Sequence, residues 1–352
     1  MSNQNQIQLV SPILKNYSIT PHFVESFGKV KRIYSDKGVF ALKKISPKHG
    51  SHFIRHIQYL YQKGYNRIIP IFPTSDGRYA VMHQNSLYYL MPWLPNEIKE
   101  DSNKRHQQMF RELARLHSLS VREVTINKEE KQKHYESTIH EWEKENEFLE
   151  GFVEECENKW YMSPFELLFC LYYIEISQAL RFSNTKFKDW YEKTKDDEKA
   201  RVVLSHGKIS TEHFIYDEKG YGYFANFEES RQGAPMHDLL PFLSRALNTY
   251  PKRSDECVDW LYTYFKYFPL KEDEMSLLQS YFAHPGKLLK TVEDYHRSSK
   301  KNERIFVQKL QKEYWTLKNS EYIVMRIEEI ERQKKLEAQA FADSQGQDGA
   351  QD

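Results

Sequence analysis

The segment from Ser205 to Leu240 holds the residues best placed for chemistry, and their types are unusual for a catalytic loop. It includes a cation at Lys208, an imidazole at His213 and a neutral amide at Asn226. A lysine ammonium can only donate hydrogen bonds, whereas Mg²⁺ prefers carboxylate and phosphate oxygens. We therefore expect no general base at Lys208 and no metal site at His213 and Asn226.

The spacing of this segment resembles that of kinase-like small-molecule phosphotransferases. In that family an H-G-D-x-x-x-x-N loop precedes a hairpin, a D-[FW]-[DE] strand end and a G-x-P-x-x-D-L helix start. The residues that match are those that shape the loop: His206, Gly207, Phe227, Glu228, Gly233, Pro235, Asp238 and Leu239. A chance match of short motifs is the alternative, but order and spacing both agree.

The resemblance implies a role for each departure from the pattern. Lys208 replaces the base aspartate, His213 the loop asparagine that holds a metal, and Asn226 the metal-binding aspartate. Asp238 is retained, and in the family the equivalent residue caps the helix start and hydrogen-bonds the loop backbone. We therefore expect the shape of the loop to be kept while its catalytic residues are lost.

The composition sets limits on fold and partners. The chain has 352 residues, enough for a bilobal fold, and its 51 basic and 50 acidic side chains give a net charge of +1. This balance does not point to nucleic acid as a partner. No apolar run approaches the ~18 residues of a spanning helix, and we expect no membrane insertion or secretion signal. Three scattered cysteines imply neither disulfides nor a zinc site.

The first hundred residues predict a small lobe rich in strands. Apolar, β-type runs separated by turn signals predict strands at Phe23–Phe27, Val30–Ser35, Val39–Ile45, Ile68–Phe72 and Arg78–His83. The spacing of apolar residues predicts a helix over Lys48–Lys63. Leu87–Trp93 resembles the hinge between the two lobes of a kinase. His49, His52 and His56 could bind zinc, but without a third ligand at suitable spacing we expect them at a surface or lobe interface.

Lys43 is the candidate cofactor-binding residue. The stretch VFALKKI resembles the strand that carries the nucleotide-contacting lysine of kinases. In an active enzyme a glutamate from the next helix holds that ammonium. Because Lys48–Lys63 has no acidic residue, we expect Lys43 to lack this partner, with Gln58 as a neutral substitute. Gly28 is the single glycine where a phosphate-covering loop usually has three.

The remainder predicts a larger, mainly helical lobe. Helices are expected at Arg105–Leu119 and in the amphipathic stretch Glu303–Lys335. The many aromatic residues between 128 and 199 are read as helix packing, with a stacking platform for a sugar or base as the alternative. The resulting division is an N-terminal extension at 1–20, an N-lobe at 21–94, a C-lobe at 95–337 and a disordered tail at 338–352.

The motifs ALKK, YYLMPWLP, ELARLHSLS and HGK-x₁₇-NFEES together resemble the CotS family of spore-coat-associated proteins, and among them the YsxE branch. The resemblance implies an α+β, bilobal protein-kinase-like fold with a small β-rich N-lobe and a large mainly helical C-lobe. It also implies synthesis in the mother-cell cytoplasm and assembly into the spore coat with other coat or morphogenetic proteins.

Three functional hypotheses follow. The first is a pseudokinase that acts as a structural component of the coat and needs no cofactor. The second is an atypical ATP-dependent phosphotransferase in which Glu212, Glu228 or Glu229 serves as base or metal ligand. The third is a pocket that binds ATP or another anion without magnesium and without turnover, with Lys208 supplying positive charge.

Overall fold

The computed structural model describes residues 3–50, 52–97, 101–298 and 302–348. The chain divides into two compact units. Unit 1 comprises Met1–Arg122, Arg201–Leu239 and Lys266–Phe268, and unit 2 comprises Glu123–Ala200, Leu240–Phe265 and Pro269–Asp352. The loop segment with the motif residues thus belongs to the same unit as the N-terminal strands.

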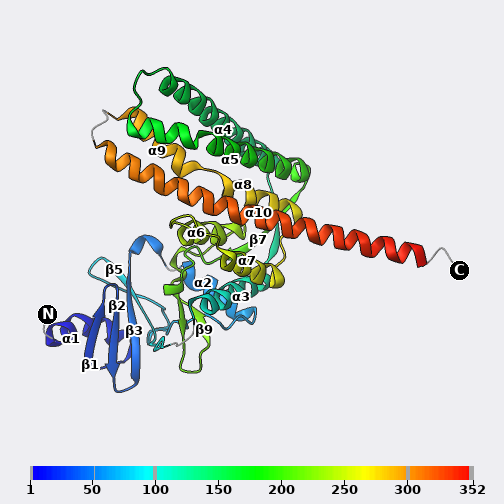
Figure 1. Cartoon of the computed structure of the whole chain (residues 1–352). Helices are drawn as coiled ribbons and strands as arrows, with labels where there is room; N and C mark the ends of the chain where they lie inside the picture. Colours follow the sequence, from blue (N-terminus) through cyan, green and yellow to red (C-terminus); the bar gives the residue numbers. More distant parts are fainter. Residues whose placement is uncertain (1–2, 51, 98–100, 299–301, 349–352) are drawn as a thin grey trace. The chain divides into compact units, whose positions relative to one another are not determined.

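A five-stranded antiparallel sheet forms the N-terminal part of unit 1 (Figure 1). Its order is β1-β2-β3-β5-β4, with β1 at Pro21–Phe27, β2 at Val30–Ser35, β3 at Gly38–Ile45, β4 at Val81–His83 and β5 at Ser86–Pro92. The first three strands lie where the sequence predicts them. Gly28 makes the first turn with a φ of 61°, a conformation that suits glycine.

The N-terminal extension is part of the fold. Helix α1 spans Asn3–Leu14 and buries Val10, Ile13 and Leu14 in the same apolar cluster as strand residues such as Val24 and Ile33. The three helix residues are three and one positions apart and so share one face. Helix α1 therefore packs against one side of the sheet and forms part of its apolar core.

The second predicted pair of strands is shorter than expected. Ile68 and Phe72 make only isolated bridges, to Phe224 and Leu90, and the expected strand at Ile68–Phe72 is therefore wrong. Pro70 interrupts this stretch and Pro73 follows it directly, and proline has no N–H to donate to a sheet ladder. The strand expected at Arg78–His83 begins only at β4.

Helices and short hairpins complete unit 1. Helix α2 spans His52–Gln62, after a 3₁₀ turn at Pro47–His49, and α3 spans Ser102–Ser120. The motif segment begins at the end of β7, Lys199–Ser205. It contains two 3₁₀ turns, at Thr211–His213 and Phe227–Glu229. It also contains three short strands: β8 at Phe214–Tyr216, β9 at Gly222–Phe224 and β10 at Arg231–Gly233. β8 pairs with β9 and β10 pairs with β7, both antiparallel. Helix α6, Met236–Ala246, begins directly after this segment.

Unit 2 is mainly helical. After β6, Arg122–Thr125, its helices are α4, Lys128–Glu157, α5, Pro164–Thr194, α7, Asp255–Tyr267, α8, Glu272–Ala283, α9, Gly286–Arg297, and α10, Glu303–Asp348. Phe165, Phe169 and Phe187 of α5 are buried in its core, as the packing interpretation predicts. Trp160 is an exception, because it lies 90% exposed in the loop before α5.

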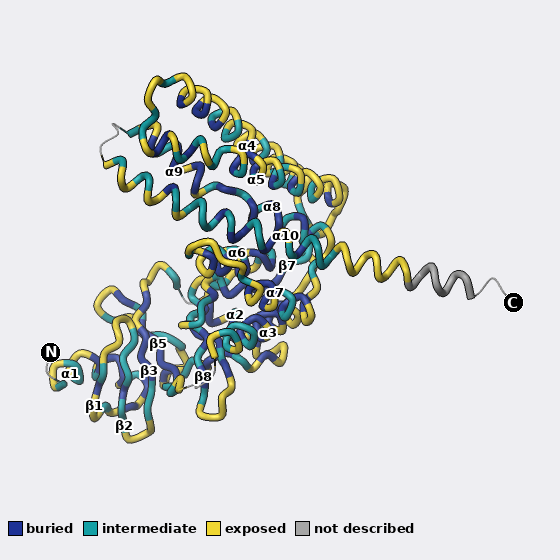
Figure 2. Tube along the Cα trace, in the orientation of Figure 1, coloured by how far each residue is buried: buried dark blue, intermediate teal, exposed yellow. Residues whose placement is uncertain are grey.

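Helix α10 continues to Asp348 and so extends into the stretch from residue 338 for which the composition predicts disorder. Alanines at 338, 340 and 342 favour helix, and no proline interrupts the stretch. Residues 349–352 lie outside the described residues. Figure 2 shows that the last turns of α10 are exposed, up to the residues drawn in grey.

Candidate functional site

Asp238 fixes the backbone of the His206-Gly207 loop. It lies in the first turn of α6, and its carboxylate accepts the backbone N–H of His206 and that of Gly207, both at 2.7 Å. The Nε2 atom of His117 lies 3.1 Å from Oδ2 of Asp238. Burial alone would raise the pKa of Asp238, but these partners hold it below its usual range. Asp238 is therefore an ionised, buried carboxylate that holds the His206-Gly207 loop in one conformation.

His206 is a structural residue. It is fully buried, its Nε2 lies 2.7 Å from the carbonyl oxygen of Ala225, and its Nδ1 accepts the backbone N–H of Lys208 at 3.2 Å. These contacts require a neutral ring with the proton on Nε2. Burial lowers the pKa of His206. With both nitrogens engaged and a Phe227 ring 4.7 Å away, His206 is not available as a general base.

Two glycines allow close backbone approaches in this segment. Gly207 has a φ of 83°, and a Cβ there would lie 2.2 Å from the carbonyl oxygen of Glu229. A Cβ at Gly233 would lie 2.4 Å from Nδ1 of His237. Pro235 stands just before α6, where its fixed φ suits a helix start. These motif residues therefore shape the loop and its exit.

Lys43 is held in an ion pair that the sequence did not predict. Its Nζ lies 2.5 Å from Oε1 of Glu228 and also donates to Oδ1 of Asn226. The hydroxyl of Tyr89 donates to the same Glu228 oxygen at 2.7 Å. Helix α2 supplies no acidic partner, as expected, but a carboxylate from elsewhere in the chain takes its place. The partner comes from the Phe227–Glu229 turn, more than 180 residues further along the chain, and not from α2.

Burial and charge decide the state of this pair. The side chains of Lys43 and Glu228 are 10% and 8% exposed. Burial lowers the pKa of Lys43, although the charge of Glu228 opposes this shift. Burial alone would raise the pKa of Glu228, but Lys43 and the hydroxyl of Tyr89 hold it below its usual range. The ion pair thus opposes the effect of burial on both groups, and the two opposite charges offset each other.

Asn226 contributes to this arrangement through its backbone and side chain. Its φ of 67° and ψ of 51° place it in the left-handed region, which asparagine tolerates better than most residues. Its side-chain oxygen accepts from Lys43. The position where relatives carry a metal-binding aspartate is thus occupied by a neutral acceptor that is already bound to a lysine.

Lys208 and His213 lie at the more open side of the loop. Nζ of Lys208 is 3.4 Å from Oε1 of Glu229, and both side chains are about half exposed. Nδ1 of His213 donates to the carbonyl oxygen of Lys208 at 2.8 Å. Burial lowers the pKa of His213. Glu212 is exposed in the 3₁₀ turn Thr211–His213, which also contains His213.

The loop residues do not assemble a metal centre. Among the residues that the structure describes, no three His, Cys, Asp or Glu side chains gather in a way that could hold a metal ion. His56, one of the three clustered histidines, instead has its Nδ1 2.8 Å from Oγ of Ser230. Within the described part of the chain, no helix has the length and apolar character needed to cross a membrane.

Two residues of the site escaped the sequence analysis. Tyr89 lies directly opposite Lys43 in the β3–β5 register, so strand pairing brings them onto one face. His117 is a buried histidine of α3 within the stretch LARLHSLS. A lone histidine in an otherwise apolar helix pattern was the available signal for a buried polar contact.

Comparisons with known proteins agree with this geometry. The family model described as "Spore coat putative kinase YutH" matches residues 11–179. This confirms the resemblance to kinase-like spore-coat proteins at that level. The search of curated proteins found no match.

Solved structures show the same fold. An aminoglycoside phosphotransferase from Alicyclobacillus acidocaldarius aligns with a TM-score of 0.66 at 14% identity, over 90% of this chain and 94% of that chain. Spectinomycin phosphotransferase in complex with ADP and spectinomycin aligns with a TM-score of 0.51 at 13% identity, over 92% and 99%. Its AMP-bound complex gives 0.52 at 17% identity, over 92% and 98%. The predicted α+β, bilobal kinase-like fold is confirmed.

Proposed function

We propose that this chain, which has the fold of kinase-like phosphotransferases, is a catalytically inactive component of the bacterial spore coat. The observation that carries the proposal is the state of Asn226: a neutral amide stands at the position of the metal-binding aspartate, and its oxygen already accepts from Lys43. In active kinases the corresponding lysine contacts the phosphates of ATP and is itself held by a glutamate. The pair between Lys43 and Glu228 is therefore compatible with an active or an inactive site, and the proposal rests on the loss of oxygen ligands.

The loss of acceptor oxygens supports the same proposal. Phosphoryl transfer needs a carboxylate that orients the acceptor hydroxyl and oxygen ligands that hold magnesium. The loop offers Lys208, His213 and Asn226 at these positions. Lys208 is a cation beside Glu229, and His213 is hydrogen-bonded to the loop backbone. The groups that remain stabilise the loop and leave the reaction without a base.

The family model that matches residues 11–179 supports a role in the spore coat. We propose that the protein is made in the mother cell, enters the spore coat and binds other coat or morphogenetic proteins. The CotS family and its YsxE branch stay our prediction for the closer relationship. In this role the kinase-like fold serves as a scaffold.

The alternative is an atypical ATP-dependent phosphotransferase that uses Glu212, Glu228 or Glu229. Glu228 is the nearest of these to Lys43, but it would have to leave that ion pair before it could bind a metal. Glu229 and Glu212 are exposed and could move. A further alternative is an anion site that binds ATP without magnesium, with Lys208 as the cation.

A thermal-melting comparison separates these functions. We expect the melting temperature of the full chain to change by less than about 1 °C with ATP at about 5 mM, with or without magnesium, because a ligand stabilises a protein only by binding its folded state. A rise that requires magnesium would support the phosphotransferase, and a rise without magnesium would support the anion site. The magnesium-dependent rise should disappear in Lys43→Ala, and the magnesium-independent rise in Lys208→Ala.

Phosphorylation assays provide a second, independent test. We expect no transfer from ATP to aminoglycosides or to choline. Transfer that is measurable in the wild-type chain and lost in Lys43→Ala would overturn the proposal.

A further inference from the structure

Helix α5 of unit 2 has an exposed apolar row on its outer face. Leu167, Leu171 and Ile174 are four and three residues apart, so their side chains lie on one face of the helix. Leu171 is 70% exposed and Ile174 67%. Trp160, in the loop before α5, is also exposed. Large apolar side chains gathered at a surface typically mark a binding region. We call Leu167, Leu171 and Ile174 the α5 row.

Acidic side chains of α4 flank the α5 row on one side. Between residues 147 and 157 the chain has five acidic residues and no basic residue. Four of them are spaced three or four residues apart and are exposed, and we call them the α4 acidic row: Glu147, Glu150, Glu154 and Glu157. This row lies close to Tyr173 of α5, the residue before Ile174. Burial raises the pKa of Tyr173, and the nearby charge of Glu150 raises it further.

The other side of the α5 row borders helix α10. A cavity of about 220 Å³ lies there, with Gln178 and Phe182 of α5 among its lining residues. Two carboxylates at its rim, Glu175 and Glu321, share the single ammonium of Lys318 at 3.1 and 2.5 Å. The apolar row is therefore bordered by excess negative charge on both sides.

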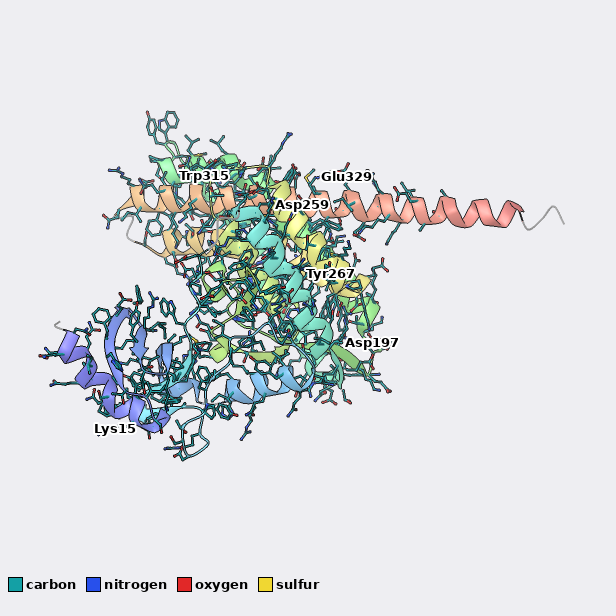
Figure 3. The ribbon with its side chains drawn as sticks, turned by 90° about the horizontal axis from the view of Figure 1, so that it is seen from below. Lys15, Asp197, Asp259, Tyr267, Trp315 and Glu329 are labelled. Atoms are coloured by element: carbon teal, nitrogen blue, oxygen red, sulfur yellow. The ribbon has the colours of Figure 1, made fainter. Side chains whose placement is uncertain are left out.

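The end of α10 has the complementary character. Residues 332–340 are all exposed, and the helix to which they belong continues beyond the other helices of unit 2 (Figures 1 and 2). They carry three basic residues and one acidic residue, with Leu336 60% exposed among them. Trp315 and Glu329, labelled in Figure 3, mark the earlier part of the same helix. The result is an exposed helix end with a net positive charge and an apolar side chain, of which Arg332, Lys335 and Leu336 line a hollow with residues of α5 and α8.

We propose that the α5 row and the α4 acidic row bind the end of α10, residues 332–340, from a second copy of this chain. Leu336 contacts the α5 row, while Arg332 and Lys335 face the carboxylates. An amphipathic helix laid against an apolar strip with charges on its flanks is a common mode of recognition. Lys335 now pairs with Glu272 at 2.9 Å, but both side chains are exposed, so this pair is easily exchanged.

The two contacting patches differ, which determines how copies associate. A contact between unlike patches leaves one patch unused on each outer copy, so the association continues as a chain unless two copies close on each other. Such growth would suit a component of a layered structure. The inference does not depend on whether the kinase-like site is active.

Sedimentation of the full chain over a concentration series up to about 100 µM tests the proposal, because weak association becomes measurable in that range. We expect the mean mass to rise with concentration at low salt and to fall at about 0.5 M NaCl, since salt screens exposed charges. Leu171→Asp should weaken association at least tenfold without changing the melting temperature. A chain that stays monomeric throughout the series would overturn the proposal.

Charge reversal gives a sharper test with a matched control. Glu150→Lys/Glu154→Lys should weaken self-association at least tenfold. Glu136→Lys/Glu141→Lys changes the charge of the same helix equally, at exposed positions six or more residues before Glu147, the first member of the α4 acidic row, and should have little effect. Equal loss in both double variants would contradict the proposed site, because it would reflect net charge alone.

Mixing two defective variants completes the test. Arg332→Glu/Lys335→Glu should also fail to self-associate. Mixed with Glu150→Lys/Glu154→Lys, it should restore association, because the reversed helix end of one variant meets the reversed row of the other. A mixture that stays monomeric would show that these two patches do not bind each other.

Discussion

Removing the carboxylate of Glu228 is the most direct test of how Lys43 is held. The variant Glu228→Leu leaves the ammonium of Lys43 buried, with the side-chain oxygen of Asn226 as its remaining partner. It also removes the acceptor of the Tyr89 hydroxyl. Breaking one side of a buried ion pair typically costs about 3–5 kcal/mol. Because Asn226 still accepts from Lys43, we expect a loss of about 3 kcal/mol in the free energy of unfolding.

Deprotonation of Lys43 limits the loss in the free energy of unfolding. The ammonium can escape an unpaired, buried position by losing its proton, and each unit by which its pKa falls costs about 1.4 kcal/mol at neutral pH. The expected consequence is a variant whose pKa at Lys43 lies further below its ordinary value and whose stability rises with pH up to that ordinary value, because the unfolded chain still binds the proton there.

Urea unfolding with hydrogen exchange resolved by peptide is the suitable assay, because it follows β3 and the Phe227–Glu229 turn separately from unit 2. The double variant Lys43→Met/Glu228→Leu removes both charges, and its stability should lie within about 1 kcal/mol of the wild type. Glu229→Leu breaks the exposed pair with Lys208 and should cost less than about 0.5 kcal/mol. The reasoning is refuted if Glu228→Leu costs no more than Glu229→Leu, or if the double variant costs the sum of its single changes.

Two further predictions concern the loop. Gly207→Ala should destabilise the chain by more than about 3 kcal/mol, because the new Cβ would overlap the carbonyl oxygen of Glu229. Gly220→Ala is the control: Gly220 has a similar φ but open space around it, so this variant should lose only about 1 kcal/mol. Equal melting temperatures of the two variants would contradict this prediction. Burial holds the pKa of His206 below the ordinary 6.5, so the unfolded chain takes up the proton first and stability should fall below pH 6.5 by up to about 1.4 kcal/mol per pH unit. An NMR titration in which the His206 ring becomes charged above pH 6.5 would disprove the neutral assignment.

Local patterns predicted much of the small lobe. The first three strands are short, rich in β-formers and separated by glycine-containing turns, and all lie where expected. The expected strand at Ile68–Phe72 is absent. Pro70 and Pro73 are visible in the sequence, but a proline prevents strand pairing only where a neighbouring strand needs its missing N–H. The composition of the tail after residue 338 is polar and predicts disorder, whereas its alanines favour the helix that continues to Asp348.

The sequence by itself determined which residue types occupy the loop: a lysine, a histidine and an asparagine where phosphotransferases place acceptors, within an intact His-Gly and Asp238 framework. Only the tertiary structure decided what Lys43 does. Its partner Glu228 is remote in sequence, and an ion pair between remote residues depends on where folding places their backbones and on the burial that strengthens their attraction. Neither the periodicity of β3 nor the composition of α2 contains that information.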